Sequence, residues 1–152
     1  MDPEAKLAEL GYTLPTPAAP VAAYVPAVRT GNLVFISGQG PIKDGQLVST
    51  GKVGRDVTLE QAQEAARIVC LNGLAALKAE IGDLAKVSRV VKLTVFVNSG
   101  PGFDQQPFVA NGASELLQEV FGEAGRHARS AVGMAELPFD MSVEIEFVFE
   151  AH

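Results

Sequence analysis

The stretch RHARSAVGMAELPFDMSVEIEFVFE, residues 126–150, decides the fold, because it holds two β-like runs with a charged side chain at the mouth of the first. Alternating side chains predict strands over residues 129–136 and 141–150, joined directly at residues 137–140. In the second run the apolar side carries Met141, Val143, Ile145, Phe147 and Phe149. The polar side carries Ser142, Glu144, Glu146 and Glu150. We expect the apolar side to meet helices, so the polar side must meet water or another subunit.

The sequence predicts two long helices and a short one. Residues 58–81 carry an apolar stripe at helical spacing, and Thr58 and Gln61 have the spacing of a capping box. A second helix is predicted over residues 106–121, and a short one over residues 1–10. The proline-rich segment after the short helix is too apolar for a free linker, so we expect it to be extended and packed on the body.

Turn signals mark the remaining strands. The Gly-Asn pair at 31–32 suits a two-residue hairpin turn between two β-like runs. The Asp-Gly pair at 44–45 is a second turn signal, before a short strand over residues 45–50. Residues 89–98 are strongly β-like. The order strand-strand, helix, strand, helix, strand-strand predicts one α+β domain with both helices on one sheet face.

Composition narrows the function classes. The chain has 152 residues, 47% of them hydrophobic, which suffices for a core without disulfides or metal. Its net charge of -6 disfavours a general nucleic-acid binder, which needs a basic face. The single cysteine, Cys70, cannot form an intrachain disulfide and fits a reducing compartment. Neither a signal peptide nor a membrane-spanning run is predicted, so we expect a cytoplasmic protein.

The sequence argues against a phosphate loop, a zinc site and a reactive thiol. The stretch GQLVSTGK, residues 45–52, resembles a phosphate loop but has the wrong spacing, and Val53 replaces the hydroxyl that would hold magnesium. The only histidines, His127 and His152, are too few for a zinc site. Cys70 lies on the apolar stripe of its helix, which indicates a buried packing thiol. We therefore expect no metal at the site.

Arg129 is the strongest candidate for a binding residue. Alternation places it on one side of its strand with Ala131, Gly133 and Ala135. Small neighbours leave room for a guanidinium to grip a carboxylate with two hydrogen bonds. The alternative is a strand-end arginine paired with a surface carboxylate.

Glu144 and Glu146 are candidates for the chemistry of the same site. If the last two strands form a hairpin that pairs odd with even positions, both glutamates share the face of Arg129. One could then orient or deprotonate water beside an anchored substrate. In the alternative interpretation, a glutamate is the ion-pair partner of Arg129 or a solvated edge residue.

The chain resembles members of the RidA family, also called the YjgF family. The resemblance covers roughly residues 20 to 150 and follows the family's element order. It divides the chain into residues 1–19, a helix with a proline-rich extension, and a RidA-like domain over residues 20–152. The stretches that carry it are AYVPAV, TGNLVFISGQGP, VVKLTVFVNS, and above all ARSAVGMAELP followed by VEIEF.

The resemblance implies a chorismate-mutase-like fold, with a mixed sheet and two helices on one face. It also implies a homotrimer in which three sheets surround a central barrel and sites lie in clefts between subunits. Family members that have an arginine at the position of Arg129 hydrolyse reactive 2-imino acids, or their enamine tautomers, to 2-keto acids and ammonia. They need neither cofactor nor metal.

Site residues follow from the resemblance by position. Arg129 matches the arginine that binds the substrate carboxylate, and Glu144 the glutamate thought to position the hydrolytic water. The residues matched to the walls of the cleft are Tyr24, Ser37, Gly38 and Asn111, while Ala131 stands where many members have cysteine. From the pattern alone, Tyr24 could be a half-buried aromatic residue, Ser37 a turn residue and Asn111 a helix-surface residue.

The expected function is hydrolytic deamination of 2-imino acids by a homotrimer. A non-catalytic trimer that binds small carboxylates or has a regulatory role is the alternative. A third possibility is an endoribonuclease or translation inhibitor, against which the acidic charge and the lack of a basic, aromatic-rich face count. The sequence names neither the preferred imine nor the role of Arg126 and His127.

Overall fold

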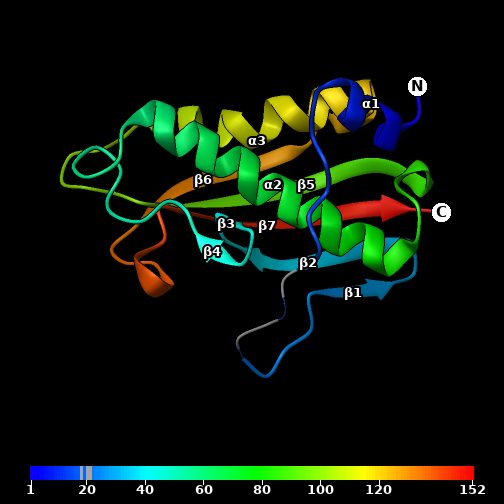
Figure 1. Cartoon of the computed structure of the whole chain (residues 1–152), viewed down its shortest axis with the longest axis horizontal. Coiled ribbons are helices and arrows are strands. Elements are labelled where there is room, and N and C mark those ends of the chain that lie inside the picture. Colours follow the sequence, from blue (N-terminus) through cyan, green and yellow to red (C-terminus); the bar gives the residue numbers. More distant parts are fainter. Residues whose placement is uncertain (18, 20–21) are drawn as a thin grey trace.

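A five-stranded mixed sheet, covered on one face by two helices, forms the body of the protein (Figure 1). The computed structural model describes residues 1–17, 19 and 22–152. The helices are α1 (Pro3–Glu9), α2 (Leu59–Ile81), α3 (Gln106–Phe121) and the short 3-10 turns η1 (Leu84–Lys86), η2 (Gly122–Gly125) and η3 (Pro138–Asp140). The strands are β1 (Ala27–Thr30), β2 (Leu33–Gln39), β3 (Ile42–Lys43), β4 (Gln46–Leu47), β5 (Val87–Asn98), β6 (Ala128–Met134) and β7 (Val143–Ala151). The predicted α+β class, mixed sheet and position of the helices are confirmed.

Local sequence signals set most of the element ends. Thr58 accepts a hydrogen bond from the Gln61 amide at 3.1 Å, while the Gln61 side chain accepts one from the Thr58 amide at 2.9 Å. The predicted capping box is therefore present at the start of α2. The Gly-Asn pair at 31–32 joins β1 to β2, with Thr30 opposite Leu33. The proline-rich segment contacts the core through Tyr12 and Leu14, while Pro20 lies outside the described residues.

The predicted strand over residues 45–50 is shorter in the structure. Asp44 and Gly45 both have positive φ, so the turn forms as expected, but β4 covers only Gln46–Leu47. Beyond it, Thr50 pairs with Met141, and the carbonyl of Ser49 accepts a hydrogen bond from the Ser142 amide. The backbone after β4 therefore follows the segment that leads into β7.

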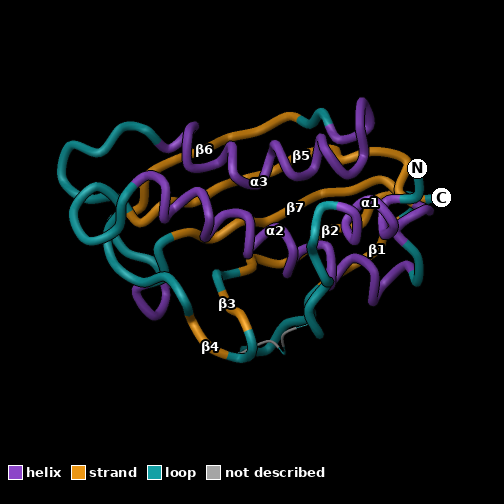
Figure 2. Tube along the Cα trace, turned by 45° about the horizontal axis from the view of Figure 1, so that its top comes forward, coloured by secondary structure: helices purple, strands orange, loops and turns teal. Residues whose placement is uncertain are grey.

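The predicted hairpin of the last two strands is wrong. The sheet order is β1-β2-β7-β5-β6, so β5 lies between β6 and β7 (Figure 2). It pairs with β6 in parallel and with β7 antiparallel. The cause is the connection through α3, because a helical crossover joins parallel neighbours, whereas hairpins need a tight turn. Residues 135–142 instead form a longer link around η3.

The core lies between the sheet and α2 with α3. The apolar side of β7 faces it, and Phe147 stacks on Phe149 with ring centroids 5.8 Å apart. Gly73 of α2 lies against the Phe147 ring, where an added Cβ would come within 2.5 Å. Cys70 is fully buried, as predicted, and its thiol lies 3.8 Å from the Ala113 carbonyl oxygen.

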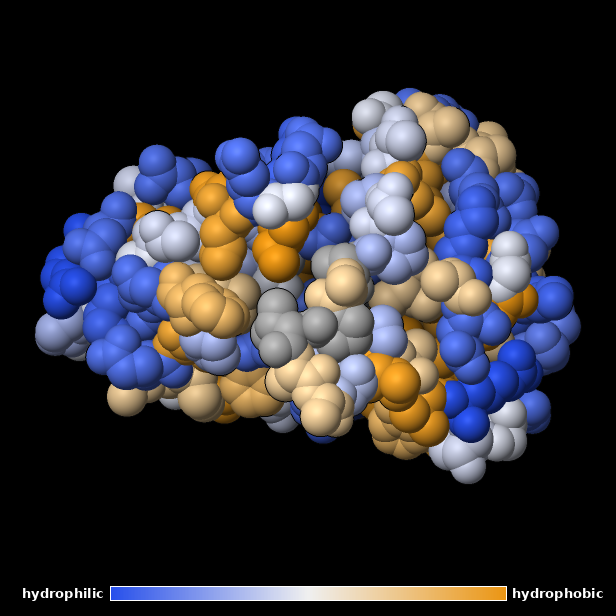
Figure 3. All heavy atoms as spheres, turned by 60° about the horizontal axis from the view of Figure 1, so that its bottom comes forward, coloured by the Kyte–Doolittle hydropathy of each residue, from blue (hydrophilic) through white to orange (hydrophobic). Residues whose placement is uncertain are grey.

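The other face of the sheet has no helix over it. Apolar side chains on this bare face are exposed, with 51% exposure for Val28, 43% for Phe35 and 40% for Val132. Polar groups lie among them: Lys92, Thr94 and Glu146 line a shallow hollow beside Val28 and Phe35. Figure 3, in which the lower side of Figure 1 is turned forward, shows apolar patches between hydrophilic side chains. No helix in the described part of the chain is long and apolar enough to cross a membrane.

The contact between α2 and α3 yields a stability prediction. A Cβ added at Gly112 would collide with the backbone carbonyl of Gln63, so Gly112→Ala should destabilise the protein. Helix propensity favours alanine by roughly 1 kcal/mol. Overpacking typically costs about 1–3 kcal/mol, and more where backbone must move, so we expect a net loss of stability. Urea unfolding followed by circular dichroism measures it.

The matched control is Glu115→Ala, an exposed position on the same helix. It should change the free energy of unfolding by less than about 0.5 kcal/mol. A Gly112→Ala protein as stable as the wild type would contradict the close approach of the two helices.

Candidate functional site

A cavity opens where the end of β2 meets the segment leading into β7. It measures about 140 Å³ and is lined by Ala19, Tyr24, Pro26, Gly38, Gln39, Gly40, Ile42, Leu47, Pro138, Phe139, Met141 and Glu144. The Glu144 carboxylate lies over Gly38, where an added Cβ would collide with its Oε2 atom. Gly38 is therefore required by the close approach of the carboxylate. Three predicted site residues, Tyr24, Gly38 and Glu144, are brought together here.

Glu144 is placed to exchange a proton. It lies on the bare face of the sheet, partly buried, two residues along β7 from Glu146. Partial burial raises the pKa of the Glu144 carboxyl above its ordinary value, and the negative charge of Glu146 raises this pKa further. A carboxylate of this kind is a stronger proton acceptor than a fully exposed one.

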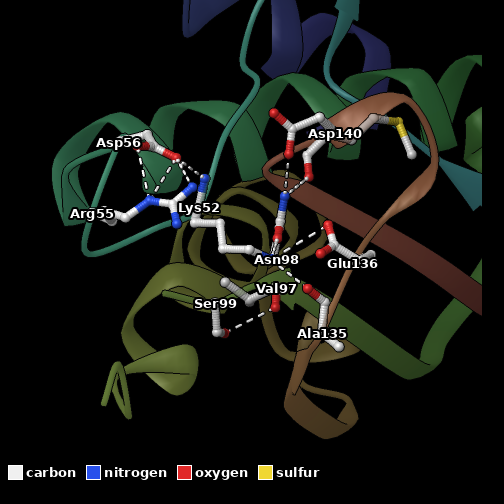
Figure 4. A network of polar contacts seen from close by, with 10 residues as sticks. Lys52, Arg55, Asp56, Val97, Asn98, Ser99, Ala135, Glu136 and Asp140 are labelled. Atoms are coloured by element: carbon white, nitrogen blue, oxygen red, sulfur yellow. Dashed lines mark hydrogen bonds and ion pairs between the residues drawn. The ribbon is translucent and has the colours of Figure 1, made fainter. Parts of the chain in front are cut away.

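A buried polar network holds the wall of the cavity (Figure 4). Asn98, at the end of β5, has no exposed surface. Its side-chain amide donates to the Asp140 carboxylate and to the Met141 carbonyl, each at 3.0 Å. Its Oδ1 accepts a hydrogen bond from Lys52 Nζ at 2.8 Å.

The same network fixes a strained segment of the backbone. Lys52 Nζ also donates to the Ala135 carbonyl and lies 3.5 Å from a Glu136 carboxylate oxygen. Phe139 and Asp140, with φ of 57° and 58°, occupy the left-handed region that side chains other than glycine disfavour. Polar anchors on both sides keep this link, and with it the exposed Phe139 ring, at the cavity. The lysine of the apparent phosphate loop is thus a structural anchor.

Arg129 lies in a second polar cluster, against α3. Its Nη1 donates to Asn111 Oδ1 at 2.9 Å and to Ser114 Oγ at 3.0 Å, and its Nη2 donates to the Pro107 carbonyl at 3.3 Å. Within the described residues these partners are all neutral, and no carboxylate pairs with Arg129. The Nε–H and one of the two Nη2 N–H groups have no partner there, and we call these free donors the open edge of the guanidinium.

This geometry bears on the interpretation of Arg129 as one half of a strand-end ion pair. A strand-end ion pair does not form with the described carboxylates, whereas the paired N–H groups of the open edge match the oxygens of a carboxylate ligand. Partial burial lowers the pKa of Arg129, which indicates that its charge is incompletely solvated and left without an anion. The cluster can therefore bind a small anion.

The two halves of the predicted site do not face each other in one chain. Arg129 is opposite Leu93 on β5, which is opposite Phe147, so Arg129 lies on the helix-covered face. Glu144 is opposite Phe96 and lies on the bare face. The shared face expected for Arg129 and the two glutamates depended on a hairpin, which does not form because β5 lies between β6 and β7.

The remaining predicted residues are divided between the clusters. Asn111 contacts Arg129, and Ala131 lies on the same side of β6, partly buried against the core. The Ser37 hydroxyl donates to the Val25 carbonyl at 2.6 Å and lines the hollow on the bare face instead of the cavity. At Gly133, the space predicted beside Arg129 is filled by Gln106, whose amide donates to Ser99 Oγ.

Sequence reasoning missed Lys52, Asn98, Ser114 and Phe139. Only Phe139 carried a signal, because a large apolar residue after Leu137-Pro138 stands in a turn where polar residues are usual. Lys52, Asn98 and Ser114 carried no such signal, because their roles depend on contacts with residues distant in sequence.

Metal and thiol chemistry find no support in the part of the chain that the structure describes. It contains no group of three or more side chains placed to hold a metal ion. Cys70 is fully buried, and burial raises the pKa of its thiol, which disfavours the thiolate form that a nucleophile needs.

Comparisons with known proteins agree with this fold. Residues 4–150 match the family model described as "YjgF/chorismate_mutase-like, putative endoribonuclease". Protein TCP17 of Trypanosoma cruzi is 48% identical over 147 residues, covering 96% of this chain and 92% of that protein. A 2-iminobutanoate/2-iminopropanoate deaminase of Escherichia coli is 33% identical, over 91% of this chain and 97% of the enzyme. The crystal structure of Atu1372, a protein of unknown function from Agrobacterium tumefaciens, is 51% identical with a TM-score of 0.92, over 99% of this chain and 93% of that one.

The Lys52–Asn98–Asp140 network yields a second prediction. Asn98→Ala removes three side-chain hydrogen bonds and leaves the buried Met141 carbonyl without its side-chain donor, so it should cost roughly 1–3 kcal/mol of stability. It should also speed hydrogen exchange in residues 135–141 more than elsewhere. Urea unfolding and hydrogen exchange by mass spectrometry measure the two effects.

Arg55→Ala is the control, since it removes an exposed ion pair with Asp56 from the neighbouring loop. It should leave the free energy of unfolding close to that of the wild type. Unchanged exchange in residues 135–141 of Asn98→Ala would show that the network does not hold this segment.

Proposed function

The chain belongs to the YjgF/RidA family, and we propose that it hydrolyses reactive 2-imino acids, or their enamine tautomers, to 2-keto acids and ammonia. The observation that carries the proposal is the Arg129 guanidinium, held on α3 by neutral partners with one edge open. The similarity to a 2-iminobutanoate/2-iminopropanoate deaminase supports a 2-imino carboxylate as the ligand. The acidic charge of the chain speaks against RNA as the substrate.

The proposed reaction needs one bound water and no redox partner. The open edge of Arg129 holds the substrate carboxylate and so fixes the imine carbon. A water oxygen bonds to the carbon of the protonated imine while ionised Glu144 accepts a water proton, and the C=N electron pair moves to the nitrogen, which forms a neutral carbinolamine. Glu144 gives this proton to the amino nitrogen. The C–N bond then breaks, ammonia leaves, and the hydroxyl proton passes to Glu144, which leaves the 2-keto acid.

A complete site requires two subunits in this proposal. Arg129 and Glu144 lie on opposite faces of one sheet, so Arg129 of one subunit serves a substrate beside Glu144 of another. In this arrangement the surface that carries Arg129 contacts a different surface, which carries Glu144. Contacts of this head-to-tail kind can close into a ring, and the family resemblance implies three subunits. The exposed apolar side chains of the bare face are available for such an assembly.

Turnover of 2-iminobutanoate tests the function. The imine is generated in situ by an amino-acid oxidase and intercepted with semicarbazide, and the protein should accelerate its loss. Arg129→Ala should reduce kcat/KM by at least about 100-fold, because a charge-assisted, two-point contact to the carboxylate is lost. Arg129→Lys keeps the positive charge but cannot make the two-point contact of a guanidinium, so it should retain part of the activity.

Mixed trimers test the shared site. Arg129→Ala and Glu144→Gln should each be nearly inactive, but refolding them together in equal amounts restores both residues in about a quarter of the sites. Recovery toward that level supports a site built from two subunits, and no recovery contradicts it. A wild-type trimer that binds 2-oxobutanoate without accelerating imine loss would instead favour the non-catalytic carboxylate-binding protein.

The pH dependence of turnover depends on Glu146. Glu144 must be ionised to accept a proton, so activity falls as the pH drops through its raised pKa. Glu146→Gln removes a like charge, lowers the pKa of Glu144, and should move the acid limb of the kcat/KM profile by about a few tenths of a pH unit toward lower pH. Glu150→Gln, farther along β7, is the control. An acid limb that stays in place would contradict the assignment of Glu144 as the proton acceptor.

A further inference from the structure

Behind Arg129, a chain of hydrogen bonds leads through Ser114 to His127. His127 Nδ1 lies 2.7 Å from the Gly125 carbonyl oxygen, and a carbonyl only accepts, so Nδ1 carries the hydrogen. In the neutral ring Nε2 is then an acceptor, and the Ser114 hydroxyl at 2.9 Å donates to it. The Ser114 oxygen in turn accepts from Arg129 Nη1. The histidine tautomer thus determines which way the serine hydroxyl points.

This arrangement keeps the Arg129 guanidinium in one orientation. Ser114 is only 5% exposed, and its oxygen is presented to Arg129 with its own hydrogen turned away toward His127. Asn111 accepts the other Nη1 N–H, so both hydrogens of Nη1 are engaged on the α3 side. The open edge, Nε–H with one Nη2 N–H, is what remains for a ligand.

We propose that Ser114 and His127 are positioning residues, which hold the Arg129 guanidinium so that its open edge receives a small carboxylate. The inference rests on the proposed function only for the class of ligand, a 2-imino or 2-keto acid. Neither residue touches the reacting atoms in this assignment. Both act through Arg129.

The charges around His127 make it a reporter of this site. Arg129 is its neighbour two residues along the chain, and both side chains form hydrogen bonds with the Ser114 hydroxyl group. The other charged groups nearby are exposed Glu115 on α3, the Glu123–Arg126 pair at η2, and Arg89 on β5, which donates to the Arg126 carbonyl. Burial lowers the pKa of His127; the hydrogen bond to Gly125 opposes this shift, and the positive charge of Arg129 adds to it.

Anion binding should therefore be linked to the protonation of His127. A carboxylate on Arg129 offsets the positive charge that disfavours the imidazolium, so it raises the pKa of His127. By reciprocity, protonation of His127 tightens carboxylate binding by the same factor. In the imidazolium Nε2 donates to the Ser114 oxygen, whose second lone pair still accepts from Arg129, so carboxylate affinity should increase as the pH falls through the titration of His127.

Histidine NMR on the full-length trimer tests the proposal without requiring turnover. The chain has only two histidines, so His152→Gln leaves the His127 signal alone, and exposed His152 serves as the internal control in the wild type. Long-range ¹H–¹⁵N spectra should show His127 as the Nδ1–H tautomer at high pH. Its titration midpoint should rise by roughly 0.5–1 pH unit with saturating 2-oxobutanoate, and similarly in Arg129→Gln.

Binding and kinetics separate positioning from a purely structural role. Ser114→Ala should weaken 2-oxobutanoate binding about five- to tenfold, and raise KM by a similar factor with little change in kcat. Glu119→Gln, an exposed change on the same helix outside the hollow that holds Arg129, should bind within about twofold of the wild type. His127→Gln, which can still accept the Ser114 hydrogen, should retain more affinity than His127→Ala.

Two results would overturn the inference. One is a His127 midpoint that moves neither with 2-oxobutanoate nor in Arg129→Gln. The other is a Ser114→Ala protein that binds 2-oxobutanoate as the wild type does. If imine hydrolysis is absent while the His127 shift and the Ser114→Ala loss are both seen, the positioning stands and the proposed catalytic function fails.

Discussion

The helical crossover from β5 through α3 to β6 is the constraint on which the rest of the structure depends. It makes β5 and β6 parallel neighbours and places β5 between β6 and β7. Because residues opposite each other in neighbouring strands share a face, this insertion sends Arg129 toward the helices and Glu144 toward the bare face. One connection therefore separates the polar cluster around Arg129 from the carboxylate in the cavity.

Each half of the candidate site is held by a different kind of support. Glu144 approaches the backbone at Gly38, next to a wall anchored by the buried amide of Asn98. Arg129 is held by neutral oxygens of α3, which engage part of its donors without cancelling its charge. A cation with only neutral partners retains its attraction for an anion, and a partly buried carboxylate keeps its affinity for a proton. Together they suit the addition of water to an anchored, electrophilic carboxylate substrate.

Much of this could be predicted from local patterns. The capping box at Thr58, the turn at 31–32 and the helix over residues 106–121 are each set by neighbours in sequence. Glu144 and Gly38 were named as candidates, and the structure places them in one cavity. The predicted hairpin failed because alternation reports which side chains share a strand face, but not which strand lies next to it.

The sequence by itself determined the long helices and strands, the buried side of β7, the lone buried cysteine and the family resemblance of the site residues. These follow from periodicity, capping and composition, which act over a few residues. Only the tertiary structure decided that Arg129 and Glu144 lie on opposite faces, that Lys52 anchors a loop, and that Ser114 and His127 support Arg129. Those relations depend on strand order and on polar contacts between segments distant in sequence, and such contacts form only after the core has brought the segments together.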